Sequence, residues 1–281
     1  MRDQLSIMTD LHPHAKQMAD ESMVRCLEAQ VQAIWPQEVG LIQRYALPNK
    51  PRILDAGCGT GEAASRLAEL FPEGNVIGVD IIDDHLALAR SRYARLASRL
   101  SFKRQSILEL TISNHSFDLT VCRHVLHSLP QAEQAIAELV RVTRPGGFLH
   151  LIPEDYDMLH FQRGTPDPRD FWHVVPPAFA AATQTDLFIG RNIFGILTKL
   201  KLTEIATNYV IVDTLRVPRE TFAAVITAWR DGYAESIGQL TPISEESARA
   251  YFNQMMANIR DPLAYAVWMV PVVSARVPPA R

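Results

Sequence analysis

Three glycines at alternate positions could bring bare backbone against a ligand. Gly57, Gly59 and Gly61 follow the apolar run 53–56 and precede a segment with helical spacing. Asp80 ends the next apolar run, about 20 residues farther along the chain. A carboxylate at the carboxyl end of a parallel strand can accept hydrogen bonds from both hydroxyls of a ribose. This arrangement predicts a nucleoside-binding βαβ unit.

The glycine spacing bears on which nucleoside is bound. A dinucleotide fold uses the pattern GxGxxG, whose third glycine would fall at position 62, where this chain has Glu62. An acid at the start of a helix would repel a pyrophosphate placed there. The sequence therefore favours a nucleoside without phosphates, and a nicotinamide dehydrogenase is a disfavoured alternative.

Side chains that can exchange protons follow two later strands of the predicted sheet. His127 follows the strand 117–122, and Asp155 and Tyr156 follow the strand 148–152. A histidine there could act as a general base, and a carboxylate could hold a cationic amine. We predict His127, Asp155 and Tyr156 as catalytic residues. The alternative is that the histidine packs or caps a helix and that the acids lie in a solvated loop.

Aromatic side chains alternate with histidines in the segment after position 153. Together with His124, the residues His160, Trp172 and His173 are predicted to contact the substrate. Such residues could form the roof of a pocket for a ring-bearing or amine substrate. Simple packing of the cap is the alternative.

The elements that position these residues alternate in the first half of the chain. Apolar runs predict strands, and segments with helical spacing lie between them. This order indicates a doubly wound, mostly parallel α/β sheet with helices on both faces. The predicted strands are 52–56, 76–79, 100–105, 117–122 and 148–152, and the helices are 61–70, 83–96 with Asp83 as N-cap, and 131–142.

The pattern is less regular at the two ends. A helix over 18–35 is expected to stop at Pro36, and a shorter helix to cover 37–46. After Pro153, residues 154–200 are expected to form an insertion over the site. The remaining expected elements are helices at 190–201, 218–238 and 243–259 and strands at 202–212 and 265–273.

Composition narrows the class of protein further. The chain has 281 residues and is 47% hydrophobic and 21% charged. Its formal charge is −3, and it has no basic block, which argues against a nucleic-acid partner. Its three cysteines have no zinc-binding spacing, so no metal is predicted and a reducing, cytoplasmic location is expected. No membrane-length apolar run or signal peptide is recognised. We expect a small-molecule partner, and the chain could be a monomer or a homodimer.

Four segments resemble motifs of class I S-adenosylmethionine-dependent methyltransferases. Residues 54–61 resemble the first motif, and Asp80 matches the acidic end of the second strand. Residues 117–127 resemble the fourth strand and the loop after it, and 144–147 the turn before the fifth. The resemblance implies a Rossmann-like sheet of seven strands ending in an antiparallel hairpin. It divides the chain into an N-terminal helical cover (1–48), a cofactor-binding core (49–153) and the remainder of the catalytic domain with substrate-cap insertions (154–281).

The resemblance also implies how the cofactor would be held. Asp80 would bind the ribose, Asp55 would hold the loop, and Ser106 occupies a position where the family commonly has an aspartate for the adenine amino group. His12 and His14, before the first helix, are expected either to reach this site or to belong to a loose terminus. The implied cofactor-binding residues are Asp55, Gly57, Gly59, Gly61, Asp80, Ile81, Ser106, Ile107 and Arg123.

The leading hypothesis is a methyltransferase that acts on a small molecule, with N- or O-methylation favoured and S-adenosylhomocysteine as product. One alternative is an enzyme that uses S-adenosylmethionine for other chemistry, such as cyclisation. Another is a non-catalytic binding protein that kept the fold. Because methyl transfer from a sulfonium depends mainly on alignment and desolvation, the sequence reveals no obligatory catalytic dyad.

Overall fold

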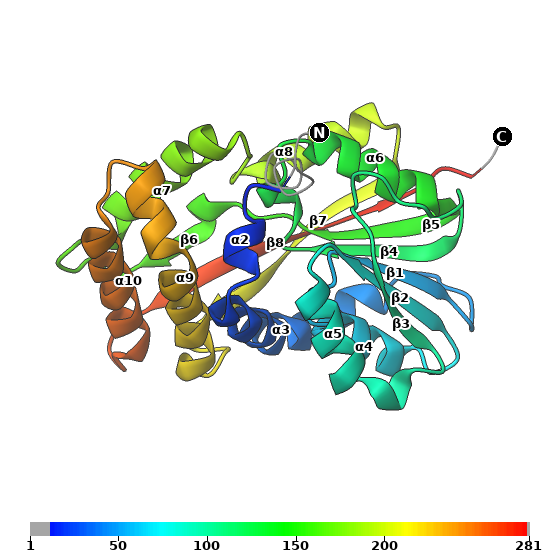
Figure 1. The fold of residues 1–281 in the computed structure, drawn as a ribbon, viewed down its shortest axis with the longest axis horizontal. Coiled ribbons are helices and arrows are strands. Elements are labelled where there is room, and N and C mark those ends of the chain that lie inside the picture. The colour runs from blue at the N-terminus through cyan, green and yellow to red at the C-terminus, as the bar shows by residue number, and fades with distance from the viewer. Residues whose placement is uncertain (1–11, 280–281) are drawn as a thin grey trace.

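A computed structural model describes residues 12–279 and has a twisted sheet at its centre (Figure 1). Within these residues the sheet has eight strands in the order β3-β2-β1-β4-β5-β8-β6, and β7 pairs with β8. The first five strands run parallel, and β8 is antiparallel to β5, β6 and β7. The strands are β1 (Arg52–Ala56), β2 (Asn75–Asp80), β3 (Leu100–Arg104), β4 (Phe117–Arg123), β5 (Thr143–Ile152), β6 (Leu159–Phe161), β7 (Thr203–Asp213) and β8 (Ala266–Arg276).

Helices cover both faces of the sheet because alternate side chains of its buried strands point to opposite sides. On one face Ile53 packs in a cluster with Leu67, and on the other Leu54 packs with Ile136 and Ile193. The predicted doubly wound α/β fold is therefore confirmed. The helices are α2 (Ala15–Met18), α3 (Glu21–Ile42), α4 (Glu62–Leu70), α5 (Asp83–Arg92), α6 (Ala132–Val142), α7 (Pro168–Thr183), α8 (Ile189–Lys199), α9 (Arg219–Leu240) and α10 (Glu245–Arg260).

A helical cap lies at one end of the sheet. Figure 1 shows α7, α9 and α10 together beyond β6, with α2 and α3 between this group and the parallel strands. A third apolar cluster joins α3 to the cap, and it contains Met23, Trp172, Trp229, Phe252 and Trp268. The cap and the N-terminal helices thus share one core, which fixes the position of the cap over the carboxyl ends of the strands.

Several local predictions are corrected by the structure. Helix α3 continues through Pro36, although a proline removes one hydrogen bond of the helix. The helical turn that follows Pro36 is stabilised by a strand outside the helix. The side-chain amide of Gln37 donates to the carbonyl of Ile211 on β7 at 2.8 Å and accepts from its N–H at 3.1 Å. Asp83 is the first residue of α5, and its N-cap is Ile82. Helix α7 and strand β6 were not predicted as elements.

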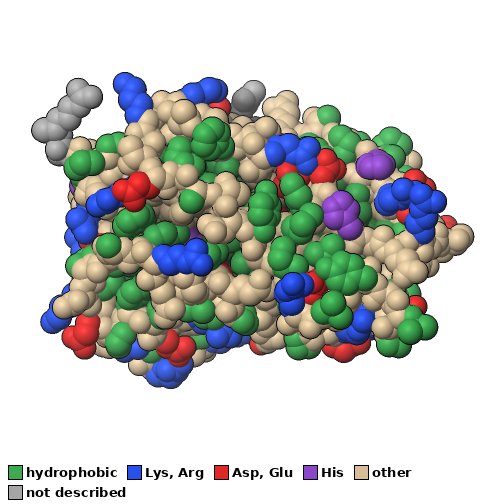
Figure 2. All heavy atoms as spheres, turned by 180° about the vertical axis from the view of Figure 1, so that it is seen from behind, with side chains coloured by type: hydrophobic (Ala, Val, Ile, Leu, Met, Phe, Trp, Pro, Cys, Tyr) green, Lys and Arg blue, Asp and Glu red, His purple; other side chains and the backbone are tan. Residues whose placement is uncertain are grey.

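The surface mixes charges of both signs. On the face seen in Figure 2, basic and acidic side chains are interspersed among apolar ones. Within residues 12–279, no helix is long and apolar enough to cross a membrane.

Candidate functional site

The glycine turn after β1 has the backbone geometry that only glycine adopts easily. Gly57, Gly59 and Gly61 have φ of 75°, 52° and 85°, in the left-handed region. Asp80 at the end of β2 organises this turn, because its carboxylate accepts hydrogen bonds from the N–H of Gly59 at 2.8 Å and of Ile82 at 3.0 Å. The turn and Asp80 therefore form one hydrogen-bonded unit.

This unit forms one wall of a cavity of about 690 Å³, which we call the glycine-turn pocket. It lies at the carboxyl ends of β1, β2 and β4, where parallel sheets bind ligands. Six of the predicted cofactor residues are in its lining: Gly57, Gly59, Asp80, Ile81, Ile107 and Arg123.

The other three predicted cofactor residues lie outside that lining. Asp55 lies in an adjoining cavity of about 320 Å³, the Asp55 recess, which Gly57, Arg123 and His124 also line. Gly61 faces β3, and a Cβ there would lie 2.8 Å from the ring of Phe102.

Ser106, the third of them, is engaged by its neighbours. Its hydroxyl accepts a hydrogen bond from the N–H of Leu108 at 3.2 Å and lies 3.3 Å from Nε2 of His12. The neighbouring side chain of Gln105 lines the glycine-turn pocket instead. His12 therefore reaches the position where the family commonly has an aspartate.

The N-terminal segment closes the glycine-turn pocket. His12, His14, Ala15 and Met18 line it, and only 8% of His12 and 4% of His14 is exposed. Of the two expectations for this segment, the structure agrees with the one in which the histidines reach the site.

A buried charge network underlies the Asp55 recess. Nε of Arg123 donates to Glu38 of α3 at 2.9 Å, and Nε2 of His150 lies 3.1 Å from the same oxygen. Burial alone would raise the pKa of Glu38, but Arg123 and His150 lower it to about 2. Burial raises the pKa of Asp55 to about 7 against the opposing effect of Arg123, and its Oδ2 has no hydrogen-bond partner among the described residues.

Three predicted residues lie between the strand ends and the cap. His124 has a φ of 55°, and its Nδ1 contacts the Glu154 carboxylate. His127 is buried with Nδ1 unpartnered in the described structure, and burial lowers its pKa to about 3. The ring of Tyr156 lies 5.7 Å from that of His127, and burial raises its pKa well above the ordinary value. His127 and Tyr156 are thus neutral near pH 7.

Asp155, which was predicted to be catalytic, is bound by an arginine. Both of its carboxylate oxygens accept hydrogen bonds from the guanidinium of Arg191, at 2.7 and 2.5 Å. One of them also accepts the N–H of Asp157 at 3.2 Å. This bidentate contact anchors α8 and balances the charge of Asp155, which disfavours its predicted role of holding a cationic amine.

His160 and His173, which were predicted to contact the substrate, are exposed and line neither the glycine-turn pocket nor the Asp55 recess. His160 is the exposed middle residue of β6, whose neighbours Leu159 and Phe161 point inward. His173 is on the exposed face of α7, next to the buried Trp172. Strand and helix periodicity place both histidines on the outer face of the cap.

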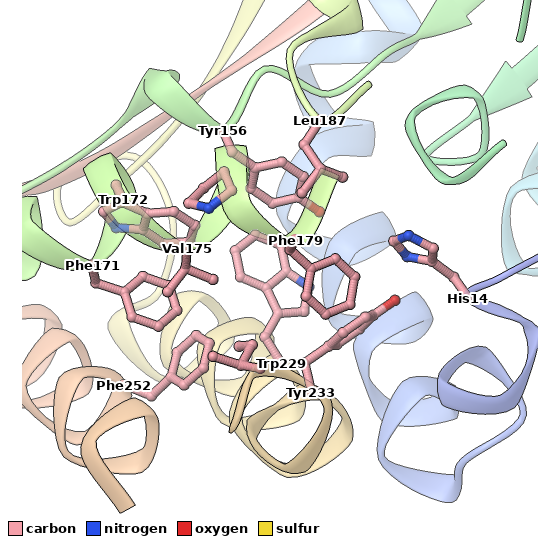
Figure 3. Close-up of a pocket in the computed structure, with 12 residues that line it drawn as sticks. His14, Tyr156, Phe171, Trp172, Val175, Phe179, Leu187, Trp229, Tyr233 and Phe252 are labelled. Atoms are coloured by element: carbon pink, nitrogen blue, oxygen red, sulfur yellow. The ribbon is translucent and has the colours of Figure 1, made fainter. Parts of the chain in front are cut away.

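Trp172 does line a cavity, of about 490 Å³, which we call the aromatic cavity. Figure 3 shows rings from α7 and α9 converging on it, with His14 at the edge. His14 belongs to the linings of both the aromatic cavity and the glycine-turn pocket. The residues of the aromatic cavity are His14, Tyr156, Phe171, Trp172, Val175, Pro176, Phe179, Leu187, Trp229, Tyr233, Ile237 and Phe252.

The sequence interpretation missed two contributors from α9 and one from α3. Trp229 and Tyr233 are four positions apart, so they share a face of a helix that was interpreted only as cap material. Glu38 lies in a segment predicted as a separate helix. For Trp229 and Tyr233, the available signal was an apolar helix face that carries a pair of large rings. For Glu38, it was an acidic residue among apolar neighbours.

Comparison with known proteins identifies the class. Residues 53–147 match the family model of a methyltransferase domain. The chain is 34% identical over 114 residues to trans-aconitate 2-methyltransferase of Deinococcus radiodurans, covering 40% of this chain and 42% of the relative. It is 35% identical over 106 residues to demethylmenaquinone methyltransferase of Lactiplantibacillus plantarum, covering 37% and 45%. The chain thus matches less than half the length of these curated relatives.

Solved structures resemble almost the whole chain. The cyclase SpnF has a TM-score of 0.55 at 22% identity, covering 86% of this chain and 80% of that one. Phosphoethanolamine N-methyltransferase 2 of Haemonchus contortus has a TM-score of 0.56 at 18% identity, covering 87% and 53%. The fold is therefore that of the class I S-adenosylmethionine-dependent methyltransferases, and residues 53–147 match the model of a methyltransferase domain.

Proposed function

We propose that this protein transfers a methyl group from S-adenosylmethionine to an oxygen or nitrogen atom of a small molecule. The observation that carries the proposal is the junction at His14, where the glycine-turn pocket meets the aromatic cavity. A donor site that shares a lining residue with an apolar cavity suits transfer between two bound small molecules.

The residues of the glycine-turn pocket fit the parts of the cofactor. Asp80 would accept hydrogen bonds from the ribose, and Ile81 and Ile107 offer apolar surface to the adenine. Asp55, with an unpartnered carboxylate oxygen in its recess, suits the ammonium of the methionine part. Glu62 also lines the Asp55 recess, and it is paired with Arg92 at 2.7 Å.

The chain's own contribution to transfer is alignment in a dry site. His127 is too weak a base to remove a proton from a free alcohol or ammonium, because burial lowers its pKa to about 3. A hydroxyl oxygen becomes strongly acidic as it accepts a methyl group, and a weak neutral base can then take its proton, whereas an amine nitrogen leaves as an ammonium and needs no base in the site. We therefore assign His127 the acceptance of a late proton.

The proposal is tested by calorimetric titration of S-adenosylmethionine and S-adenosylhomocysteine. We expect binding of both, and Asp80→Ala should weaken it roughly 100-fold, since hydrogen bonds to a charged group contribute about 1.5–3 kcal/mol each. The matched control is Asp83→Ala, which removes an exposed carboxylate three residues farther on. Asp80→Ala also leaves the N–H groups of Gly59 and Ile82 unpaired, so thermal unfolding without cofactor must show a folded variant.

Two results would remove the proposal: no binding of either compound at high micromolar concentration, or an unchanged affinity in folded Asp80→Ala. We also expect a reducing, cytoplasmic location, which the three buried free cysteines support.

A second candidate is cofactor-dependent chemistry other than methyl transfer, such as cyclisation. The likeness to the cyclase SpnF over 86% of this chain favours keeping it. Product analysis separates the two functions. Methyl transfer yields S-adenosylhomocysteine in proportion to product, whereas 5′-methylthioadenosine would point to attack on the aminocarboxypropyl side of the cofactor.

A further inference from the structure

The aromatic cavity contains no charge of its own. Among the described residues that line it, only His14 could be cationic, and burial lowers its pKa to about 4. The acids Glu154 and Asp155 are not among the lining residues. Arg191 binds both carboxylate oxygens of Asp155, and His124 contacts one oxygen of Glu154, whose Oε2 is buried without a partner among the described residues. An ionic ligand would therefore lose its hydration in this cavity without meeting an opposite charge in the lining.

A cationic ligand meets a second obstacle. The aromatic faces that could attract it pack on one another: Tyr156 stacks on Trp172 at 5.9 Å, and Trp229 packs edge-on against both at 5.8 and 6.4 Å. The sulfonium of the methyl donor in the adjoining pocket would also repel it. The lining therefore favours a neutral ligand with a large apolar surface.

Unpartnered polar atoms lie in and beside the lining of the cavity. Nε1 of Trp172 and the ring nitrogens of His14 belong to lining residues, and His14 also borders the glycine-turn pocket. His127 lies next to two lining residues, His14 and Tyr156. Both ring nitrogens of His14 and Nδ1 of His127 are buried without a hydrogen-bond partner among the described residues. The two rings are 6.4 Å apart. Burying a polar atom without a hydrogen-bond partner is unfavourable, so a ligand that bonds to these atoms recovers that cost.

Neutral imidazoles suit a neutral polar group. Each has one nitrogen that donates and one that accepts, and a hydroxyl or a neutral amine also does both. Figure 3 shows the His14 ring directed towards the rings of Phe179 and Tyr233, whose centroids lie 5.3 and 6.0 Å from it. A ligand lying among the rings would present its polar end at His14.

We propose that the aromatic cavity takes an uncharged, ring-containing acceptor whose single hydrogen-bonding atom is held by His14 and His127 at the junction with the donor pocket. His14 is then a positioning residue contributed by the N-terminal segment. Calling the ligand the acceptor rests on the function proposed above; the preference of the cavity for neutral rings does not.

Three naphthalene compounds of matched shape test the preference: 2-naphthol, 2-naphthoate and 2-naphthylmethylammonium. Each is titrated calorimetrically into the full-length protein, with and without saturating S-adenosylhomocysteine. We expect 2-naphthol to bind at least tenfold more tightly than either ion. No binding of 2-naphthol up to its solubility limit, or equal or tighter binding of either ion, overturns the proposal.

The residue assignment is tested with His14→Leu, which keeps bulk and removes the hydrogen bonds. We expect it to weaken 2-naphthol binding about tenfold. The matched control is His173→Leu, an exposed histidine on α7 that should leave binding unchanged. Unchanged binding in folded His14→Leu refutes the role of His14, and the wild-type comparison of the three compounds remains decisive if that variant does not fold.

Failures of the two proposals can be told apart. If S-adenosylhomocysteine binds but the naphthalene preference is absent, the inference about the cavity is wrong and the methyltransferase proposal stands. If the cofactor does not bind but 2-naphthol is preferred in its absence, the proposed function fails and the cavity assignment stands.

Discussion

Binding of S-adenosylmethionine should release a proton from Asp55. Burial raises the pKa of this carboxyl to about 7 in the protein without ligand, so about half of the molecules hold the proton at pH 7. The amino-acid part of the cofactor brings an ammonium to the recess where Asp55 Oδ2 has no partner in the described structure. A positive charge there favours the ionised carboxylate and expels the proton.

The size of the effect follows from Coulomb's law. An ammonium separated from the carboxylate by one water, about 5.5 Å away in a medium of effective dielectric constant about 20, contributes about 3 kcal/mol. That energy corresponds to about 2 pKa units and brings the pKa of Asp55 from about 7 to about 5. The expected release is then about 0.8 proton at pH 6, about 0.5 at pH 7 and about 0.1 at pH 8.

The assay is titration calorimetry in buffers that differ in ionisation enthalpy. At each pH, the slope of the observed binding enthalpy against the buffer enthalpy gives the number of protons released. Two controls isolate the source. Asp55→Asn should release none, and 5′-methylthioadenosine, which lacks the amino-acid part, should release none from the wild type.

Stability offers a second measurement of the same carboxyl without cofactor. Its folded pKa of about 7 exceeds the ordinary value of 3.8, so the folded state binds the proton more tightly between those values. Stability relative to Asp55→Asn should therefore fall as pH rises from about 4 to about 7, by at most about 4 kcal/mol. Proton release near zero at both pH 6 and pH 7, or equal release in Asp55→Asn, would refute the reasoning.

Two further substitutions test how the pocket is built, each by denaturant unfolding and cofactor titration. Gly57→Ala should lower the free energy of unfolding by about 2–4 kcal/mol and weaken cofactor binding, since φ is 75° and the new Cβ would lie 2.3 Å from Cγ2 of Val125. The control Gly40→Ala should have neither effect, because a Cβ at Gly40 would have no neighbouring atom within 4 Å. Glu38→Gln should cost about 3–5 kcal/mol at pH 7, unlike the exposed Glu28→Gln. Because the pKa of Glu38 is lowered from 4.5 to about 2, that difference should persist above about pH 4.5 and shrink as pH falls towards 2. Equal effects of either substitution and its control would contradict the assigned role.

The parts of the fold that the sequence predicted well are those encoded locally. The bounds of β1 agree with the prediction, because an apolar run fully buried by helices on both sides ends at a glycine turn. Asp80 was placed at the pocket for the same reason, since its position follows from one strand and one turn. Helix α3 was cut at Pro36 because the contact that supports it, Gln37 with Ile211, is 174 residues away in the chain.

The acceptor side could not be assembled in the same way. Periodicity was available to exclude His160 and His173, but recognising their outward faces required the bounds of β6 and α7, which the prolines and short apolar runs obscured. Asp155 is less available to a ligand because it is bound by Arg191, which lies 36 residues farther along the chain. Proximity to a strand end indicates where a side chain lies, and its availability depends on a partner from another element.

This difference between the two pockets has a physical consequence for how the protein works. The glycine-turn pocket is built mainly from contiguous core segments, whereas the aromatic cavity takes His14 from the N-terminal segment, Trp172 from α7 and Trp229 from α9. Because His14 borders both pockets, the segment that covers the donor also completes the wall of the acceptor cavity. A cofactor that contacts this segment should therefore also hold His14 in place for a ligand of the aromatic cavity, which lowers the entropy cost of binding that ligand. Positive coupling between the two ligands is the expected result, and it should be lost in His14→Leu while the aromatic rings remain in place.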